Sequence, residues 1–285
     1  MEILRYIRCM KDKPLKTVNF ADELKSGKHF GIFIDDTGSP GLDTPGLNMN
    51  RKTWVALIIP PHQMPEVMEQ LPGALSYLKE MGIHDPEFHF KDILAGKGDY
   101  KKVDLQVRLA IFRFMAHIFA QYKFPALVQT FDPINSAELL ANSNFPKSFG
   151  PLQFNKHDDL ALIFLLLKVR QYLQEQTGGS NTACVVVDEG RLKDGQSIVM
   201  PGLAPEFLHG AILFASSRKV KPVQLADFAA FALNKWQLLR VKPELNDIDK
   251  TLLEIFSPIG ESFINTEKMN VHGLSNLINI KQGLN

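Results

Sequence analysis

Acidic residues at three places far apart in the sequence each stand where an apolar segment meets a turn or a helix start. Asp35 and Asp36 end the run GIFIDD, Asp188 ends ACVVVD, and Asp227 lies within PVQLADFAAFAL. A carboxylate buried without a partner is costly. A bound metal ion would stabilise such acids where apolar neighbours cannot. The pattern therefore predicts that the fold brings these carboxylates together around a cation.

Asp35 and Asp36 are expected to differ in role, because successive residues of a strand point to opposite faces. Asp35 follows three apolar residues and is the one expected to point inward as a metal ligand. Asp36 can equally cap the turn at Thr37-Gly38, since aspartate side chains bond nearby backbone amides. Asp188 also has two interpretations, a site residue at the sheet edge or the start of the turn at Gly190.

Asp227 shares one face of its expected helix with Gln224, by i,i+3 spacing, and its neighbours are small or aromatic. A favourable interaction with the helix N-terminus contributes only about 0.5 kcal/mol near a surface. This does not offset the burial of a charge. Metal ligation is therefore the preferred interpretation of Asp227.

Two further groups of residues are candidates for the same site. Glu87 and His89 alternate with phenylalanines in EFHF, so on a strand they would share one face, as a fourth carboxylate and a general base. A solvent-facing strand edge explains them equally well. A polar and basic stretch before the Asp227 helix is a candidate for contacts with substrate phosphates, although such runs are often only solvated. Its candidate residues are Ser217, Arg218, Lys219 and Gln224.

Composition limits the possible functions. The chain has 285 residues, of which 45% are hydrophobic, so it can bury a large core. Its 32 basic and 31 acidic side chains nearly cancel, so nucleic acid could bind only through a local basic patch. Cys9 and Cys184 are too scattered for a disulfide framework or a structural zinc site, which favours a reducing cytoplasm. No signal peptide or membrane segment is expected, because the longest apolar run is far short of about 20 residues.

Hydrophobic periodicity and turn formers predict a mixed α/β architecture, in which helices cover a mixed sheet. The first two strands are expected to form an antiparallel hairpin with a long loop, and 87–90 reads as a short alternating stretch. The expected strands are 29–35, 53–59, 124–131, 182–188 and 211–216, and the expected helices are 64–81, 103–122, 157–176 and 223–239. We expect one domain over 29–240, preceded by an N-terminal extension (1–28) and followed by a C-terminal helical appendage (241–285).

These motifs resemble, in order, those of the domain of unknown function 3800 family. The family opens on a strand that reads Tyr-Ile-Asp-Glu-Ser-Gly, to which Phe33-Ile34-Asp35-Asp36-Thr37-Gly38 is similar. The change from Glu to Asp at Asp36 shortens that side chain by one methylene. The other resembling motifs are Glu87-Phe88-His89, Val186-Val187-Asp188-Glu189, and Ser216-Ser217 followed by Gln224-Leu225-Ala226-Asp227.

The resemblance implies a ribonuclease H-like fold with a carboxylate cluster that binds Mg²⁺ or Mn²⁺. Asp35, Asp188 and Asp227 would be metal ligands, and Glu87 or Asp36 the fourth acid. The expected function is a metal-dependent phosphodiester hydrolase of the nuclease type, with His89 as a proton shuttle. The alternative is a non-catalytic ribonuclease H-like module that binds nucleic acid or a protein partner, in a defence or mobile-element setting.

Overall fold

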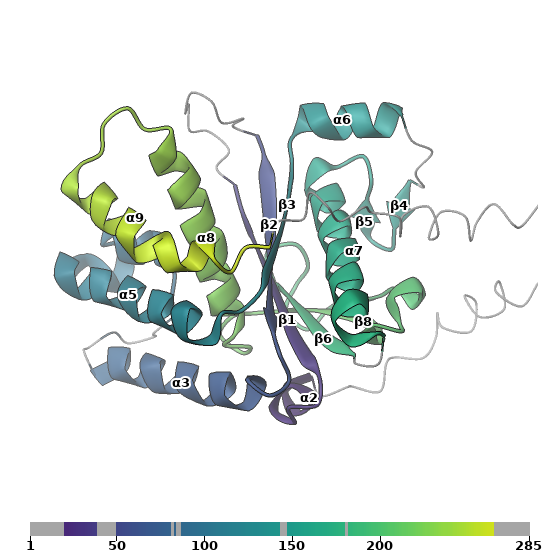
Figure 1. Ribbon diagram of the computed structural model, residues 1–285, viewed down its shortest axis with the longest axis horizontal. Helices are drawn as coiled ribbons and strands as arrows, with labels where there is room; N and C mark the ends of the chain where they lie inside the picture. The colour runs from purple at the N-terminus through teal and green to yellow at the C-terminus, as the bar shows by residue number, and fades with distance from the viewer. Residues whose placement is uncertain are drawn as a thin grey trace, which may run out of the picture.

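A six-stranded mixed sheet forms the centre of the computed structural model, which describes residues 20–38, 50–80, 83, 87–142, 147–179 and 182–264 (Figure 1). The strand order is β3-β2-β1-β6-β8-β7. A separate two-stranded ribbon pairs β4 (Ser148–Phe149) with β5 (Leu152–Gln153). The strands of the main sheet are β1 (Phe30–Thr37), β2 (Lys52–Ile59), β3 (Ala126–Phe131), β6 (Ala183–Asp188), β7 (Ser197–Val199) and β8 (Phe207–Ala215).

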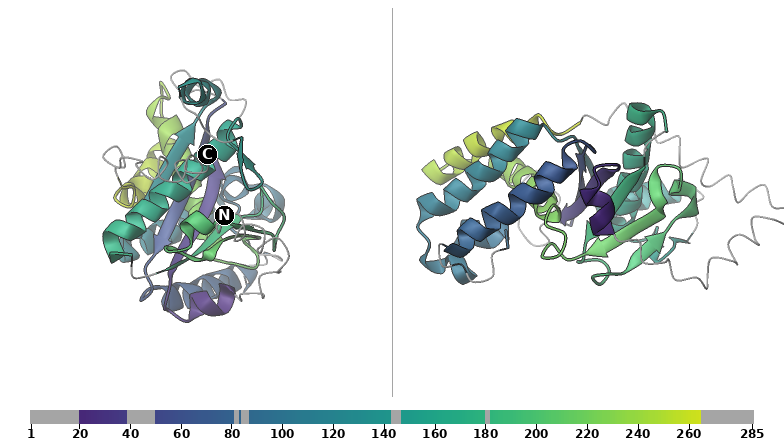
Figure 2. Two further views of the ribbon diagram at one scale, coloured as in Figure 1. Left: turned by 90° about the vertical axis from the view of Figure 1, so that its right-hand side faces the viewer. Right: turned by 90° about the horizontal axis from the view of Figure 1, so that it is seen from below.

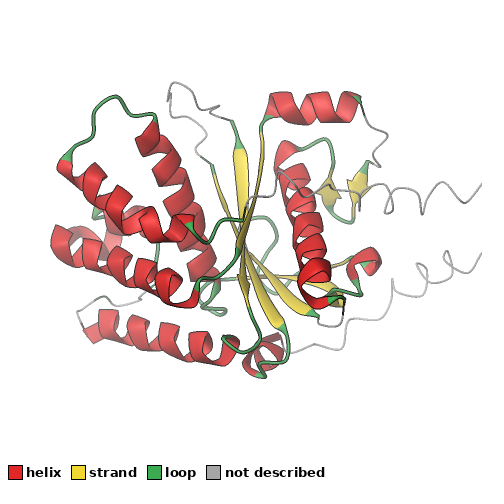
Figure 3. Cartoon of the chain, in the orientation of Figure 1, coloured by secondary structure: helices red, strands yellow, loops and turns green. Residues whose placement is uncertain are grey.

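Helices cover both faces of this sheet, as Figure 2 and Figure 3 show from different sides. One face carries α3 (Met64–Glu80), α5 (Leu105–Tyr122), α8 (Val223–Arg240) and α9 (Asp247–Gly260), and the other carries α7 (His157–Thr177). Shorter helices are α2 (Phe20–Lys25), α4 (Phe90–Ala95) and α6 (Pro133–Ala141), with 3-10 turns at Gly98–Lys102 and Pro201–Leu203.

Strand alternation divides the core into two apolar layers. Phe33 of β1 packs in the layer beneath α3, α5 and α8, whereas Ile32 and Ile34 pack in the layer beneath α7. The same parity holds in β6, where Val186 belongs to the first layer and Val187 to the second. Because a strand turns successive side chains to opposite faces, residue parity alone decides which helical layer a side chain meets.

The three central strands β1, β6 and β8 run parallel, while β2, β3 and β7 pair antiparallel with their neighbours. Five consecutive residues of β6 are buried, as expected for a parallel strand that is covered on both faces. The carboxyl ends of β1 and β6 therefore meet at one edge of the sheet, where ligands of α/β folds gather.

Most of the predicted elements are confirmed, including the mixed sheet flanked by helices and the antiparallel pairing of the first two strands. Residue 81 of the first expected helix lies outside the described residues. The last expected strand begins earlier than predicted, because β8 starts at Phe207. None of the helices in the described ranges combines the length and hydropathy of a bilayer span.

The prediction of a strand at 87–90 is wrong. Residues 87–89 are irregular, and Phe90 begins the helix α4, whose first turn bonds to the carbonyl of His89. The helical conformation buries Phe90 and Ile93 completely, and the ring of Phe90 lies 4.8 Å from that of Phe228. Burial against α8 thus overrides the local alternation of polar and aromatic residues.

The expected C-terminal appendage contains α9, which begins in a capping box at Asn246 and packs on α5 and α8. Its residues Leu252 and Phe256 belong to the main core. After α9 the chain returns to the sheet, where Ile264 donates its backbone N–H to the carbonyl of Ala126 in β3. The expected division of the chain into an N-terminal extension, one domain and a C-terminal appendage stays a prediction.

Candidate active site

Asp35 and Asp188 are neighbours at the carboxyl ends of two parallel strands. The register of β1 and β6 pairs Ile34 with Val187, and each acid is the next residue of its strand. Their parity turns both side chains to the sheet face covered by α8, the face that also receives Phe33 and Val186. The prediction that Asp35 points inward is confirmed, since it is only 9% exposed.

Asp227 reaches the same place from α8, which packs on β1 and β6. It lies in the second turn of the helix, which begins directly after Pro222, and proline suits a helix start because its missing N–H has no partner there. The carboxyl groups of Asp35 and Asp227 are close enough for each to change the pKa of the other. Three acids from three separate elements therefore lie on one face at one end of the sheet.

These three carboxylates oppose one another electrostatically. Burial raises the pKa of Asp35 well above its ordinary value, and the charges of Asp227, Asp36 and Asp188 raise it further. Burial, with the charges of Asp188 and Glu87, raises the pKa of Asp227 to about 8. Burial also raises the pKa of Asp188. No ion pair within the described residues joins any of the three to a basic side chain.

Asp36 lies on the opposite face, because β1 continues through Thr37 before it turns. Its carboxylate forms an ion pair with Lys52 of β2, whose ammonium is also 4.0 Å from Asp158 at the start of α7. Burial raises the pKa of Asp36, although Lys52 opposes the shift. Unlike Asp35, Asp36 already has a cationic partner.

Glu87 is buried beside the three acids, and all of its carboxylate contacts come from donors. It accepts hydrogen bonds from the Ser217 hydroxyl and from Arg218 Nε at 2.8 Å, and His89 Nε2 lies 3.1 Å away. Burial opposes ionisation, but the bonds from Ser217 and Arg218 outweigh it and lower the pKa of Glu87. The predicted pairing of Glu87 with His89 thus exists, although in a loop and not on a strand.

Gln224 holds this loop to the start of α8. The side chain is 1% exposed, accepts a bond from the Phe88 N–H at 3.2 Å and donates to the Ser217 carbonyl at 3.0 Å. Lys219 forms an ion pair with Asp194. The residues predicted to contact phosphates are therefore engaged in contacts within the protein, with Ser217 and Arg218 on Glu87.

A cleft of about 630 Å³ opens beside the acids, between α4 and α8. The end of β1 contributes residues 36–38 to its lining, and His89, with a 58% exposed side chain, stands at its rim. The lining residues of the two helices are Phe90, Lys91, Asp92, Leu94 and Ala95 from α4, and Asp227, Phe231, Asn234, Lys235 and Leu238 from α8.

The residues of α8 that line the cleft beyond Asp227 were not predicted. The sequence nevertheless indicates them, because Phe231, Asn234 and Lys235 follow Asp227 at i+4, i+7 and i+8 and so share its helix face. Lys91 was not predicted as a cleft residue, because residues 87–90 were expected to be extended and not to lead into a helix. Helix α4 turns it toward the cleft.

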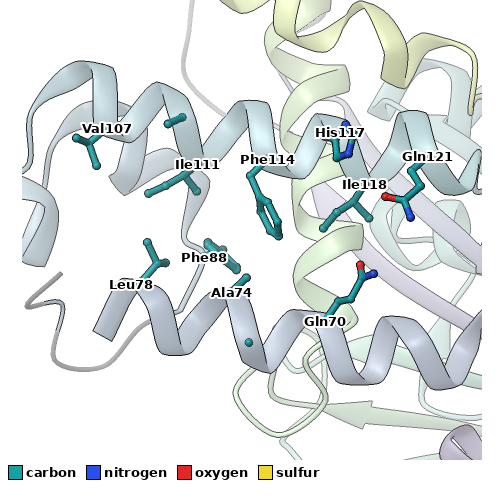
Figure 4. A pocket seen from close by; sticks show the side chains of 12 residues that line it. Gln70, Ala74, Leu78, Phe88, Val107, Ile111, Phe114, His117, Ile118 and Gln121 are labelled. Atoms are coloured by element: carbon teal, nitrogen blue, oxygen red, sulfur yellow. The ribbon is translucent and has the colours of Figure 1, made fainter. Parts of the chain in front are cut away.

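A second hollow, of about 620 Å³, lies between α3 and α5 (Figure 4). Its lining is mainly apolar, with Leu78, Ile111 and Phe114 on its walls. Polar side chains gather toward one end, where Gln70, His117 and Gln121 lie. No acidic residue is among the described residues that line this groove.

The three acids suit a hard divalent cation by their chemistry, since they offer carboxylate oxygens and have no counter-charge. In the described ranges, however, no three His, Cys, Asp or Glu side chains lie close enough to hold one ion.

Comparison of the chain with protein-family models, with curated protein sequences and with solved structures found no match. The resemblance to the domain of unknown function 3800 family, and the ribonuclease H-like fold that it implies, stay predictions.

Proposed function

We propose that this protein is a metal-dependent phosphodiester hydrolase of the nuclease type, with a ribonuclease H-like fold. The observation that supports it most is the convergence of Asp35, Asp188 and Asp227 from three elements onto one face beside a cleft, without a basic partner among the described residues. Mutual repulsion of this kind destabilises the folded protein. Carboxylates with perturbed pKa values in clefts are frequent at active sites, where a function compensates for that cost.

In this proposal Asp35, Asp188 and Asp227 would hold Mg²⁺ or Mn²⁺ ions. When bound, such ions lower the pKa of a water molecule and stabilise the leaving oxygen of a phosphodiester. His89 stands at the cleft rim, where an imidazole can accept or return a proton near neutral pH. Its contact with Glu87 would orient the ring for that transfer.

Glu87 is the better of the two candidates for a fourth acid. The charges of both candidates raise the pKa of Asp188 and Asp227, but Asp36 points to the other face toward Lys52. In the proposed enzyme Glu87 also positions Ser217 and Arg218 at the mouth of the site.

The test is hydrolysis of bis(p-nitrophenyl) phosphate in Mn²⁺ by the full chain and by two variants, Asp35→Asn and Asp227→Asn. We expect both to lose turnover and to keep the circular dichroism spectrum of the wild type. Asp99→Asn, which changes an exposed acid in the turn after α4, is the matched control and should keep full activity. Retained turnover in both Asp35→Asn and Asp227→Asn would contradict the proposal.

The rival function is a non-catalytic binding module. It is favoured by one observation, the absence of a three-residue metal group in the described part of the chain. On this account neutralising Asp35 or Asp227 relieves repulsion and raises stability, and Mn²⁺ changes neither variant nor wild type. A Mn²⁺ titration of thermal unfolding separates the two functions without a choice of substrate.

A further inference from the structure

The basic side chains that border the cleft differ from those around it in their partners. Lys52, Arg218 and Lys219 each form an ion pair with a carboxylate. Lys91 and Lys235 line the cleft, and no ion pair to either occurs within the described ranges. Their charges are therefore available to an anion.

A third cation, Arg51, is not a lining residue of the cleft, but it is hydrogen-bonded to Asn234, which is one. Its Nη2 donates to Asn234 Oδ1 at 2.9 Å and to Gln237 Oε1 at 3.1 Å, both on α8. Both acceptors are neutral amides, so they fix the guanidinium without cancelling its charge. A guanidinium held in this way is suited to a phosphate, which it can bind through its remaining N–H groups.

An aromatic side chain lies between the acids and these cations. Asp227, Phe231 and Lys235 follow one another at i, i+4 and i+8 along the cleft wall. Eight residues of helix rise about 12 Å, so the wall presents an acid, a ring and a cation in sequence over that length. Phe231 is half-buried, with its ring 5.6 Å from that of Phe112, and its remaining surface faces the cleft.

On the premise of the proposed function, we infer that the substrate is a single-stranded polynucleotide whose backbone follows α8 away from the acids. Arg51, Lys91 and Lys235 bind its phosphates, and a base stacks on Phe231. Basic grooves with aromatic side chains on which bases stack are the usual means of binding single strands.

The size of the cleft favours one strand over two. Its volume of about 630 Å³ lies in the range that encloses a drug-sized ligand. A duplex, whose major groove alone is about 12 Å wide, needs more room than this volume provides. Asp92 also lines the cleft and would repel a phosphate, so of the α4 side chains that line the cleft Lys91 is the one that attracts the backbone.

The test measures binding of fluorescein-labelled dT12 by fluorescence anisotropy, with the full chain in Ca²⁺ and with the oligonucleotide checked afterwards for cleavage. Arg51→Gln and Lys235→Gln should each weaken binding several-fold, and each should reduce the slope of log K against log salt by about 0.7. Phe231→Leu should weaken binding with no change in that slope. Lys79→Gln removes an exposed lysine of α3 outside the cleft and is the matched control, which should bind like the wild type.

The inference is overturned if wild type does not bind dT12, if Arg51→Gln and Lys235→Gln bind like Lys79→Gln, or if a 12-base-pair duplex binds more tightly than the single strand. Wild-type hydrolysis of bis(p-nitrophenyl) phosphate is measured in parallel, because it reports on the proposed function alone. Turnover of this small diester without cleft-dependent binding of dT12 rejects only the inference. Cleft-dependent binding without turnover of any diester rejects only the hydrolase.

Discussion

Two hollows of nearly equal volume lie on the same helical side of the sheet, and their linings have little in common. The cleft between α4 and α8 holds acids, lysines and one half-buried ring, whereas the groove between α3 and α5 is mainly apolar. They meet at two residues, since Phe88 lines the groove, Phe90 lines the cleft, and their rings stack 5.8 Å apart.

The comparison shows that volume alone does not identify a site of chemistry. Among the described residues that line the groove there is no carboxylate, and His117 is the one titratable side chain, so the groove lacks the oxygen ligands that hard divalent cations prefer. In the cleft, Asp227 carries a pKa of about 8 because burial and neighbouring charges oppose its ionisation. The cleft therefore differs from the groove in the electrostatic repulsion among its acids, and not in its volume.

The largest expected effect is on catalysis. Asp35→Asn should lower hydrolysis of bis(p-nitrophenyl) phosphate by about a thousandfold or more, because a ligand that stabilises developing charge is lost. Phe114→Ser, in the groove, should leave the rate unchanged. Steady-state kinetics in Mn²⁺ measures both. Equal losses in the two variants would remove the distinction between the cleft and the groove.

The second largest expected effect is the change in the free energy of unfolding when Mn²⁺ binds. At about a hundred times its dissociation constant, Mn²⁺ should stabilise wild type by about 2.7 kcal/mol, and Asp227→Asn should gain much less. Thermal unfolding across a Mn²⁺ titration gives this difference directly. Leu78→Ala, a groove variant, should start from a lower midpoint and gain as much as wild type. An Mn²⁺-induced gain in stability as large in Asp227→Asn as in wild type would show that the cleft acids do not bind the metal.

Without divalent cations, stability should fall as pH rises. The pKa of Asp227 is about 8 in the folded chain against 3.8 for the ordinary group, so between these values the folded state binds more protons than the unfolded one. The free energy of unfolding therefore decreases from about pH 4 to about pH 8, and the raised pKa of Asp35 acts in the same direction. Urea unfolding at several pH values measures the slope, which Asp227→Asn should flatten. A slope that Asp227→Asn leaves unaltered would assign the pH dependence to other groups.

Substitution of Gln224, which holds the loop between the cleft and the groove, should lower both stability and activity. Gln224→Ala leaves the Phe88 N–H and the Ser217 carbonyl without their partner, and each unsatisfied buried group costs about 1–3 kcal/mol. We expect a loss of about 2 kcal/mol in urea unfolding, together with slower hydrolysis, because the loop that carries Glu87 loosens. Gln224→Glu keeps the acceptor for Phe88, but it buries a carboxylate against the Ser217 carbonyl and the neighbouring acids, so it should lose at least as much. An unaltered unfolding curve for Gln224→Ala would show that the loop is held by other contacts.

The smallest effect is expected in the groove. Phe114 is 39% exposed, so Phe114→Ser should change the free energy of unfolding by less than about 1 kcal/mol. Chemical denaturation measures this change. A loss as large as that of Gln224→Ala would mean that the groove wall is part of the core.

Much of the candidate site follows from local patterns. The apolar runs before Asp35 and Asp188 specify buried strands, and the start of α8 specifies a helix that carries Asp227. Because these elements are long and strongly periodic, their local propensity and their burial agree. The loop at Glu87 is different, since four alternating residues are too few to outweigh the burial of Phe90 and Ile93 in a helix.

The sequence by itself determined that three acids end or interrupt apolar segments, and so that each must enter or border the core. Only the tertiary structure decided which of them meet. The parallel register of β1 and β6 puts Asp35 beside Asp188, residue parity turns Asp36 away toward Lys52, and Gln224 ties Glu87 to the loop before α8. It also decided which cations remain unpaired in the described part of the chain, such as Lys235. The pairings of Asp35 with Asp188 and of Gln224 with Phe88 join residues more than a hundred positions apart, and they depend on how helices cross over the sheet, which no local pattern encodes.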